Sequence, residues 1–149
     1  MNKMRNIVLA FIAVIAAFAC STSGGKGEMD QATKVKFDQY VVQGKSLYST
    51  YCIQCHQQNG EGLAQLYPPL AKSDYLMENF ARAACIVKNG QTQEIVVNGV
   101  TYNQVMPGLT QLTNLEIAEI LTYITNSWGN EGGIQEVSSV EKWLADCEE

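Results

Sequence analysis

The sequence predicts an all-α fold with one small β-hairpin, built as a single domain. Apolar residues recur at helical spacing in residues 37–51, 76–87 and 115–128. Ahead of the last of these segments, β-branched residues flank Asn98-Gly99, a dipeptide typical of tight hairpin turns. With 149 residues, less a predicted targeting segment, the chain supports one domain and one core.

Residues 1–19 have the composition of an export signal. Lys3 and Arg5 precede an uninterrupted apolar run over residues 7–19, and this run is too short to cross a bilayer comfortably as a helix. We therefore predict a cleaved signal peptide over residues 1–19. A membrane anchor retained in the mature protein is the alternative.

Ala17-Phe18-Ala19-Cys20 resembles a bacterial lipoprotein signal, in which the cysteine becomes the acylated first residue. The resemblance implies lipidation of Cys20, and ordinary cleavage after Ala19 is the rival interpretation. Residues 21–29 are rich in Ser and Gly and lack apolar periodicity. We therefore expect residues 20–36 to form a lipidated cysteine and a flexible tether.

The predicted domain covers residues 37–130, and residues 131–149 form a C-terminal extension. The domain opens with a helix whose apolar positions follow one face: Phe37, Tyr40, Val41, Gly44, Leu47, Tyr48 and Tyr51. Glycine is unfavourable inside a helix. We therefore expect another element to pack closely against Gly44.

Two further elements follow in the middle of the domain. Residues 76–87 have helical spacing and end before Asn89-Gly90, so they predict a second helix. Residues 94–102 predict a hairpin with Asn98-Gly99 at its turn.

The last clear helix is predicted over residues 115–128. Thr113 and Glu116 form a capping-box pattern at its start, and Gly129 suits the position just after its end. We expect this helix to cross the first one at Gly44, through an apolar stripe of Ile117, Ile120, Leu121 and Ile124.

One short motif carries the chemistry of the chain. Cys52-Ile53-Gln54-Cys55-His56 is a C-x-x-C-H sequence, and His56 is the single histidine of the protein. Two thiols at this spacing, followed at once by an imidazole, are the arrangement that attaches a c-type haem. Each thiol can add to one vinyl group, and the imidazole can then reach the iron. The motif therefore predicts Cys52 and Cys55 as attachment sites and His56 as an iron ligand.

The second iron ligand is predicted to be Met106. Once the signal peptide is removed, the chain has three methionines. Met29 lies in the tether, and Met77 lies in a helical pattern, where packing is the usual role of methionine. Met106 precedes Pro107 in a non-helical stretch. Because proline restricts the backbone there, we expect a loop that holds the thioether against the haem.

Together these features resemble the class I c-type cytochromes over residues 37–130. The order of elements is shared: a helix that runs into C-x-x-C-H, a Pro-Pro segment at residues 68–69, a middle helix, a Met-Pro loop and a final helix. The resemblance implies a cytochrome c-like fold around one covalently attached haem c and a role in electron transfer. It also implies that the Pro68 carbonyl accepts a hydrogen bond from His56 and orients its ring.

Three further side chains are candidates to bind the haem propionates. Asn98, Tyr102 and Trp128 carry amide, phenol and indole groups, all of which can donate hydrogen bonds. Structural roles, as a turn residue and two core aromatics, are an equally open alternative.

Three of the five cysteines lie outside the haem motif. If Cys20 is lipidated, Cys85 and Cys147 remain as an even pair that could form a disulfide in an oxidising compartment. Two free thiols are the alternative, because the sequence gives no distance between them.

The formal charge of the chain is −5, and loss of Lys3 and Arg5 with the signal peptide makes it −7. Binding to nucleic acid needs clustered cations, so nucleic acid is not expected as a partner. We expect redox proteins of a respiratory chain as electron donors and acceptors, and no small-molecule substrate. The expected location is the periplasmic side of a bacterial membrane, held by the lipid anchor, or the soluble periplasm if Cys20 is not acylated.

With both axial iron positions filled by the protein, an electron carrier is expected rather than an enzyme. A haem sensor or peroxidase would need an open iron position. A docked haem subunit of an oxidase or reductase is a further alternative. A zinc site would need more ligands than the motif supplies, and a thioredoxin-like cysteine pair would need a βαβ setting.

Overall fold

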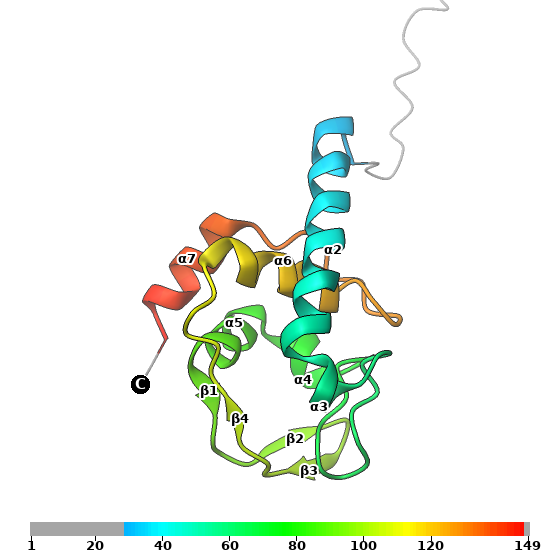
Figure 1. Ribbon diagram of the computed structural model, residues 1–149, viewed down its shortest axis with the longest axis vertical. Coiled ribbons are helices and arrows are strands. Elements are labelled where there is room, and N and C mark those ends of the chain that lie inside the picture. The colour runs from blue at the N-terminus through cyan, green and yellow to red at the C-terminus, as the bar shows by residue number, and fades with distance from the viewer. Residues whose placement is uncertain (1–28, 148–149) are drawn as a thin grey trace, which may run out of the picture. The chain divides into compact units, whose positions relative to one another are not determined.

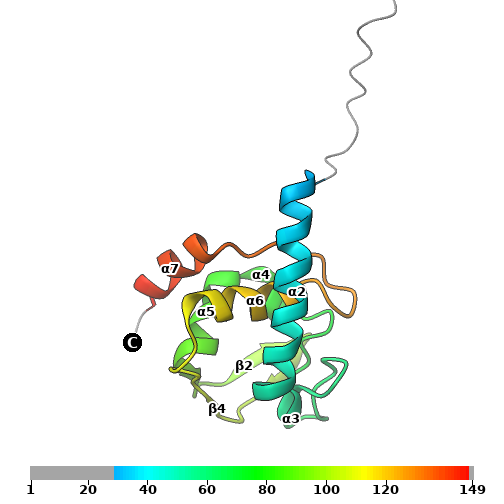
Figure 2. The same cartoon turned by 45° about the horizontal axis from the view of Figure 1, so that its top comes forward.

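Residues 29–147 are described by the computed structural model that Figures 1 and 2 show from two directions. The chain is divided into two units at Asp30, and the elements described below belong to the second unit, which begins at Gln31. The predicted signal peptide and Cys20 lie outside the described residues. Among the helices of residues 29–147, none combines the length and apolar character needed to cross a membrane.

The second unit is mainly helical, as the sequence predicts. Its helices and strands are α2 (Gln31–Tyr51), α3 (Ile53–His56), α4 (Asp74–Glu78), α5 (Phe80–Asn89), β1 (Gly90–Gln91), β2 (Ile95–Val97), β3 (Val100–Tyr102), β4 (Met106–Pro107), α6 (Asn114–Ile124) and α7 (Val137–Ala145).

Helices α2 and α6 cross in close contact at the core (Figures 1 and 2). The buried face of α2 carries Tyr40, Gly44 and Tyr48, which follow one another at four-residue intervals. A Cβ built on Gly44 would overlap the carbonyl oxygen of Glu119 and lie 2.8 Å from Tyr123 Cβ. The close approach predicted at Gly44 is therefore confirmed.

Helix α2 begins at Gln31, so the prediction of a tether that reaches residue 36 is wrong for its last part. Charged side chains support this first stretch of the helix. Lys34 pairs with Asp38 at 2.6 Å, one turn along, and Lys36 pairs with Glu136, just before α7. The hydrogen bond to Glu136 raises the pKa of Lys36. Because these contacts are not apolar, hydrophobic periodicity could not reveal this part of the helix.

The single helix predicted over residues 76–87 is instead two helices, α4 and α5, separated at Asn79. Ser73 Oγ accepts a hydrogen bond from Leu76 N at 3.1 Å at the start of α4. Asn79 has an extended backbone, and its Oδ1 accepts from Arg82 N at 2.9 Å at the start of α5. Such caps satisfy the free N–H groups in the first turn of a helix. Ser73 and Asn79 therefore each begin a helix in the region where apolar periodicity predicts only one.

Helix α6 starts as predicted, with both hydrogen bonds of the capping box between Thr113 and Glu116. It ends at Ile124, however, and does not continue to Trp128. The side chains of residues 125–127 each donate a hydrogen bond of 2.7 Å to the carbonyl four residues earlier. Side-chain bonds of this kind compete with the helical backbone pattern, which explains the earlier end.

Strands β2 and β3 form the predicted hairpin. Asn98 and Gly99 at its turn have φ values of 52° and 77°, which suit a tight type I′ turn. A second antiparallel pair joins β1 to β4, with Gln91 opposite Met106. A Cβ built on Gly90 would lie 2.6 Å from Met106 O, so this pairing needs glycine. Met106 therefore lies in a short strand and not in the loop that the sequence predicts.

Helix α7 packs against α5 and α6, with the side chain of Val140 fully buried between them. A disulfide joins Cys85 of α5 to Cys147, which follows α7, across a sequence separation of 62 residues. The described part of the predicted extension, residues 131–147, thus belongs to the same compact unit as the domain.

Replacing Gly44 by Ala should push α2 away from α6. The new methyl group would meet backbone atoms of Glu119, which cannot rotate aside. We therefore expect the free energy of unfolding, measured with guanidinium, to fall by about 1–3 kcal/mol. Ser46→Ala, on the exposed face of the same helix, is the control and should change it by less than about 0.5 kcal/mol. Equal stability of the Gly44→Ala variant and the wild type would contradict the close crossing.

Removing the disulfide by the double change Cys85→Ser and Cys147→Ser should lower the free energy of unfolding by about 2–4 kcal/mol, because the bond closes a long loop in the unfolded chain. Alkylation under denaturing, non-reducing conditions, followed by mass spectrometry, tests the bond itself. We expect no alkyl group on either cysteine of the wild-type protein. Alkylation of both would show that they are free thiols.

Candidate functional site

A large cavity with a mainly apolar lining lies beside the C-x-x-C-H turn. Its empty space is about 1040 Å³, with the open mouth included. Its wall is formed by α3, the segment after it, α4, α5, the four strands and α6, and most of the side chains on it are apolar. In Figure 1, α3 lies to the right of these elements, the β1–β4 pair lies to the left, and β2 and β3 lie below. The cavity has the apolar character typical of a cofactor site.

The two motif cysteines and the histidine lie on one wall of this cavity. At the end of α2, Cys52 N donates a hydrogen bond to Tyr48 O at 2.9 Å. His56 N in turn donates to Cys52 O at 3.0 Å, so the helical hydrogen-bond pattern continues into the motif. Residues separated by three or four positions share one face of a helical turn. Local helical structure therefore presents Cys52, Cys55 and His56 together.

The imidazole of His56 is held by the Pro68 carbonyl, as the resemblance implies. His56 Nδ1 lies 3.0 Å from Pro68 O, so Nδ1–H donates this bond and the lone pair remains on Nε2. Burial lowers the pKa of His56, and the bond to Pro68 acts in the opposite direction. A neutral imidazole with a free Nε2 is the form that binds a metal.

The segment between His56 and Pro68 folds back because two glycines permit close contacts. A Cβ built on Gly62 would overlap Tyr67 O, and one built on Gly60 would lie 2.5 Å from Trp128 Cε3. Gly60 O accepts hydrogen bonds from the two residues that follow the Pro-Pro segment, at 2.7 and 2.9 Å. These contacts bring the Pro68 carbonyl to the histidine ring.

Met106 lies on the cavity wall, on strand β4, with its side chain half-buried. Within residues 29–147 the other two methionines lie elsewhere. Met29 is exposed, and Met77 packs against the core from α4. Of the three described methionines, only Met106 shares the cavity with His56.

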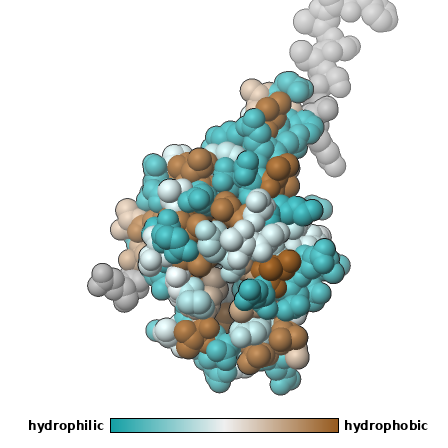
Figure 3. Space-filling model, viewed as in Figure 1, coloured by the Kyte–Doolittle hydropathy of each residue, from teal (hydrophilic) through white to brown (hydrophobic). Residues whose placement is uncertain are grey.

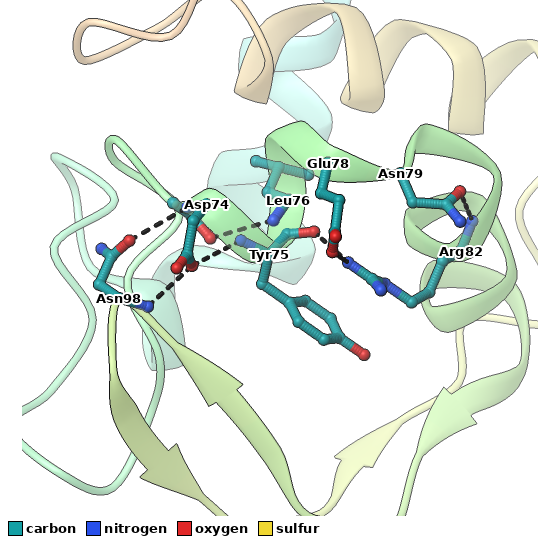
Figure 4. Close-up of polar contacts among 8 residues, drawn as sticks. Asp74, Tyr75, Leu76, Glu78, Asn79, Arg82 and Asn98 are labelled. Carbon is teal, nitrogen blue, oxygen red and sulfur yellow. Dashed lines mark hydrogen bonds and ion pairs between the residues drawn. The ribbon is translucent and has the colours of Figure 1, made fainter.

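Of the three residues predicted to bind propionates, only Tyr102 lines the cavity, where its side chain is buried. Asn98 instead holds the hairpin against α4 (Figure 4). Its backbone N–H donates to Asp74 Oδ1 at 2.7 Å, and its Oδ1 accepts from Asp74 N at 3.1 Å. Trp128 packs against Tyr48 and Tyr123, with ring centroids 5.2 and 5.4 Å away. Asn98 and Trp128 do not line the cavity, and their contacts are those of a turn residue and a packed aromatic.

One charged residue of the wall, Arg82, was missed by the sequence interpretation. It lies on α5 and lines the cavity together with Ala83 and Ile86. Arg82 lies four residues before Ile86 and therefore shares a helix face with it. A cation on the same face as an apolar residue is the sequence feature that could have indicated its place on the cavity wall.

The geometry gives no support to a zinc site or a redox-active thiol pair. Across residues 29–147, no three His, Cys, Asp or Glu side chains are grouped so that they could hold a metal ion. Burial raises the pKa of the Cys52 thiol to about 12, and the electrostatic interaction with Cys55 acts in the same direction. Reactive cysteines need a lowered thiol pKa.

A helical fold that presents C-x-x-C-H and a methionine to one cavity defines the class of c-type cytochromes. The chain belongs to the cytochrome c family, whose profile, described as Cytochrome c, matches residues 41–128. Cytochrome c-552 from Thermus thermophilus is 37% identical over 91 residues, which cover 58% of this chain and 69% of that protein. A second T. thermophilus cytochrome c-552 has the same identity and is covered over 61% of its length.

A further relative is the cytochrome c subunit of a quinone-dependent alcohol dehydrogenase from Gluconacetobacter polyoxogenes. It is 30% identical over 92 residues, which cover 60% of this chain and 19% of that subunit. Family membership gives the protein one covalently attached haem c and a role in electron transfer. The predictions of a class I, single-haem cytochrome and of its mainly helical fold are confirmed.

Proposed function

We propose that this cytochrome is an electron carrier whose haem is attached through Cys52 and Cys55 and whose iron is bound by His56 and Met106. The observation that carries the proposal is the convergence of these four side chains on one apolar cavity. The thiols and the imidazole come from a single turn at α3, and the thioether comes from β4, 50 residues after the histidine. The two thiols are suited to covalent attachment of haem. The neutral imidazole and the thioether are suited to binding the iron from its two sides.

The haem iron supplies a one-electron couple, and the residues around it set how readily it is reduced. Histidine with thioether ligation favours the ferrous state relative to ligation by two imidazoles. The Pro68 carbonyl fixes the His56 ring and raises the basicity of Nε2. Apolar side chains on the wall limit the access of water to the ligands.

A carrier is favoured over an enzyme or sensor because protein ligands would occupy both axial positions. Substrate could reach iron only after a ligand had left. The chain has no second histidine, which is a common acid–base group in catalysis. An exchangeable Met106 would instead favour a haem sensor or peroxidase.

We also propose that the protein is a lipoprotein on the periplasmic side of a bacterial membrane. The charged and apolar pattern of residues 1–19 and the position of Cys20 support an exported, acylated chain. The bond between Cys85 and Cys147 supports an oxidising compartment. It also leaves Cys20 as the one cysteine outside the disulfide and the haem motif. Without acylation, the protein would be soluble in the periplasm.

Its proposed partners are redox proteins of a respiratory chain, with no nucleic acid and no small-molecule substrate. Removal of residues 1–19 leaves a formal charge of −7, which would steer the protein toward basic surfaces. Polar residues predominate on the face seen in Figure 3, with apolar residues in separate patches. Such a surface suits short-lived contacts between redox proteins.

A docked haem subunit is the second candidate function. The relative named as the cytochrome c subunit of a quinone-dependent alcohol dehydrogenase supports this candidate, because a region similar to this chain forms part of a subunit there. Copurification of the protein with a dehydrogenase, oxidase or reductase in stoichiometric amounts would favour this candidate over a mobile carrier.

Replacing Met106 by Ala should leave the haem attached but open one axial position. We expect a lower midpoint potential and a visible spectrum altered by loss of the thioether, because thioether ligation favours ferrous iron. Carbon monoxide binding to the reduced protein should rise from undetectable to nearly one per haem. Met77→Ala, on α4 away from the cavity wall, is the control and should leave the spectrum unchanged. An unaltered spectrum and no carbon monoxide binding in Met106→Ala would rule out this ligand.

Replacing Cys20 by Ser should move the protein from the membrane fraction to the soluble periplasmic fraction, because the acylated thiol would be lost. Fractionation followed by haem staining measures this directly. The matched control is Ser21→Ala, which keeps the cysteine and should stay with the membrane. If the Cys20→Ser protein also stays there, acylation is not the anchor.

A further inference from the structure

The chain that follows Met106 is fastened to the end of α5. Strand β4, which begins at Met106, pairs with β1, and β1 continues directly from α5 (Figure 1). Two residues further on, Gly108 lies so close to α5 that an added Cβ would be 2.6 Å from the carbonyl carbon of Asn89. Leu109 N then donates a hydrogen bond of 2.9 Å to Val87 O. This part of the chain therefore takes its position from α5.

The side chain of Lys88, in the last turn of α5, continues this attachment. Its Nζ donates hydrogen bonds of 2.8 Å to Thr110 O and 2.7 Å to Leu112 O. Both carbonyl groups belong to the turn Leu109–Leu112, which we call the linker turn because it lies between β4 and α6. A bond of 3.0 Å from Leu112 N to Leu109 O closes it. One ammonium group thus ties two carbonyls of the linker turn to α5.

The charge of Lys88 is directed at the backbone and not at an acidic side chain. None of the ion pairs among residues 29–147 includes Lys88. A lysine ammonium carries three donors, and two of them are used on the linker turn. Hydrogen bonds with a charged donor are roughly twice as strong as neutral ones. The attachment of the linker turn therefore depends to a large extent on this side chain.

Met106 itself lies in a weakly held part of the chain. Strand β4 is only two residues long, and a short two-stranded pair is marginally stable by itself. Residues 103–105, which precede the methionine, are exposed. Segments with few buried contacts open locally at a lower free energy than the core. The position of Met106 therefore depends on how firmly the chain after it is attached.

We propose that Lys88 is a positioning residue for the iron ligand. By tying the linker turn to α5, its ammonium keeps the Met106 thioether at the iron and slows the exchange of this thioether for external ligands. The inference rests on the proposed ligation by Met106. Lys88 lies outside the cavity wall, so it acts through the backbone of the linker turn.

The test is the rate at which the oxidised, haem-loaded protein binds imidazole. At saturating imidazole, this rate is limited by the departure of Met106 from the iron. Lys88→Met keeps an unbranched side chain but removes all the donors. It should raise the limiting rate about 10-fold, as expected for the loss of hydrogen bonds from a charged group. Lys88→Arg keeps both charge and donors and should restore most of the wild-type rate.

The matched control is Lys45→Met, which removes one positive charge from an exposed position on α2. It should leave the limiting rate unchanged. If Lys88→Met also leaves this rate unchanged, Lys88 does not hold Met106 and the proposal is wrong. A wild-type protein that binds imidazole without a limiting rate would show that Met106 is not the ligand. That result would overturn the proposed function together with this inference.

Amide hydrogen exchange separates local positioning from stabilisation of the whole fold. In Lys88→Met, the Leu109 amide, which donates to Val87 O, should exchange faster with water. The amide of Ile120, in the buried core of α6, should keep its protection. An equal loss of protection at both amides would mean that Lys88 stabilises the whole fold, and would contradict the proposal.

A measurement on the wild-type protein covers the case in which Lys88→Met does not mature. Displacement of Met106 by saturating imidazole should speed the exchange of the Leu109 amide, because coupling between two events in one protein is reciprocal. If the thioether has left the iron and the Leu109 amide keeps its full protection, the linker turn does not hold the methionine. The proposal is then wrong.

Discussion

The contact between the backbones of α2 and α6 at Gly44 is the constraint on which the site depends. Cys52 directly follows α2, and its backbone N–H still donates a helical hydrogen bond to Tyr48 O. The position of α2 therefore also determines the position of the C-x-x-C-H turn. On the other side of the contact, α6 contributes Ile120 and Ile124 to the cavity wall. Because no side chain separates the two helices at Gly44, one contact positions both the C-x-x-C-H turn and the apolar surface that α6 contributes to the cavity.

Burial decides the chemical state of the groups at this site. It lowers the pKa of His56, so the ring is neutral and can bind a metal through Nε2. It raises the pKa of Cys52, so that thiol is held protonated until it is modified. Against this apolar background, the fixed charge of Arg82 is the main electrostatic feature of the wall. The cavity therefore suits a large, mainly apolar group.

Features with a local cause could be predicted from the sequence, whereas those set by tertiary contacts could not. The C-x-x-C-H turn, the Asn98-Gly99 hairpin and the need for glycine at position 44 follow from nearby residues. The start of α2 depends on the distant partner Glu136. The position of the Arg82 side chain also depends on tertiary structure, because its neighbours Tyr75 and Glu78 lie on another helix.

Carbon-13 labelling of the methionine methyl groups in the ferrous protein tests the ligation most directly. A methyl group that lies over the haem at the iron experiences the ring current, so its signal should shift far upfield. We expect one such signal, and it should remain in Met29→Leu and Met77→Leu variants, which leaves Met106 as its source. A spectrum in which all methionine methyl signals stay at ordinary positions, although the haem is attached, would contradict the assignment of sulfur opposite His56.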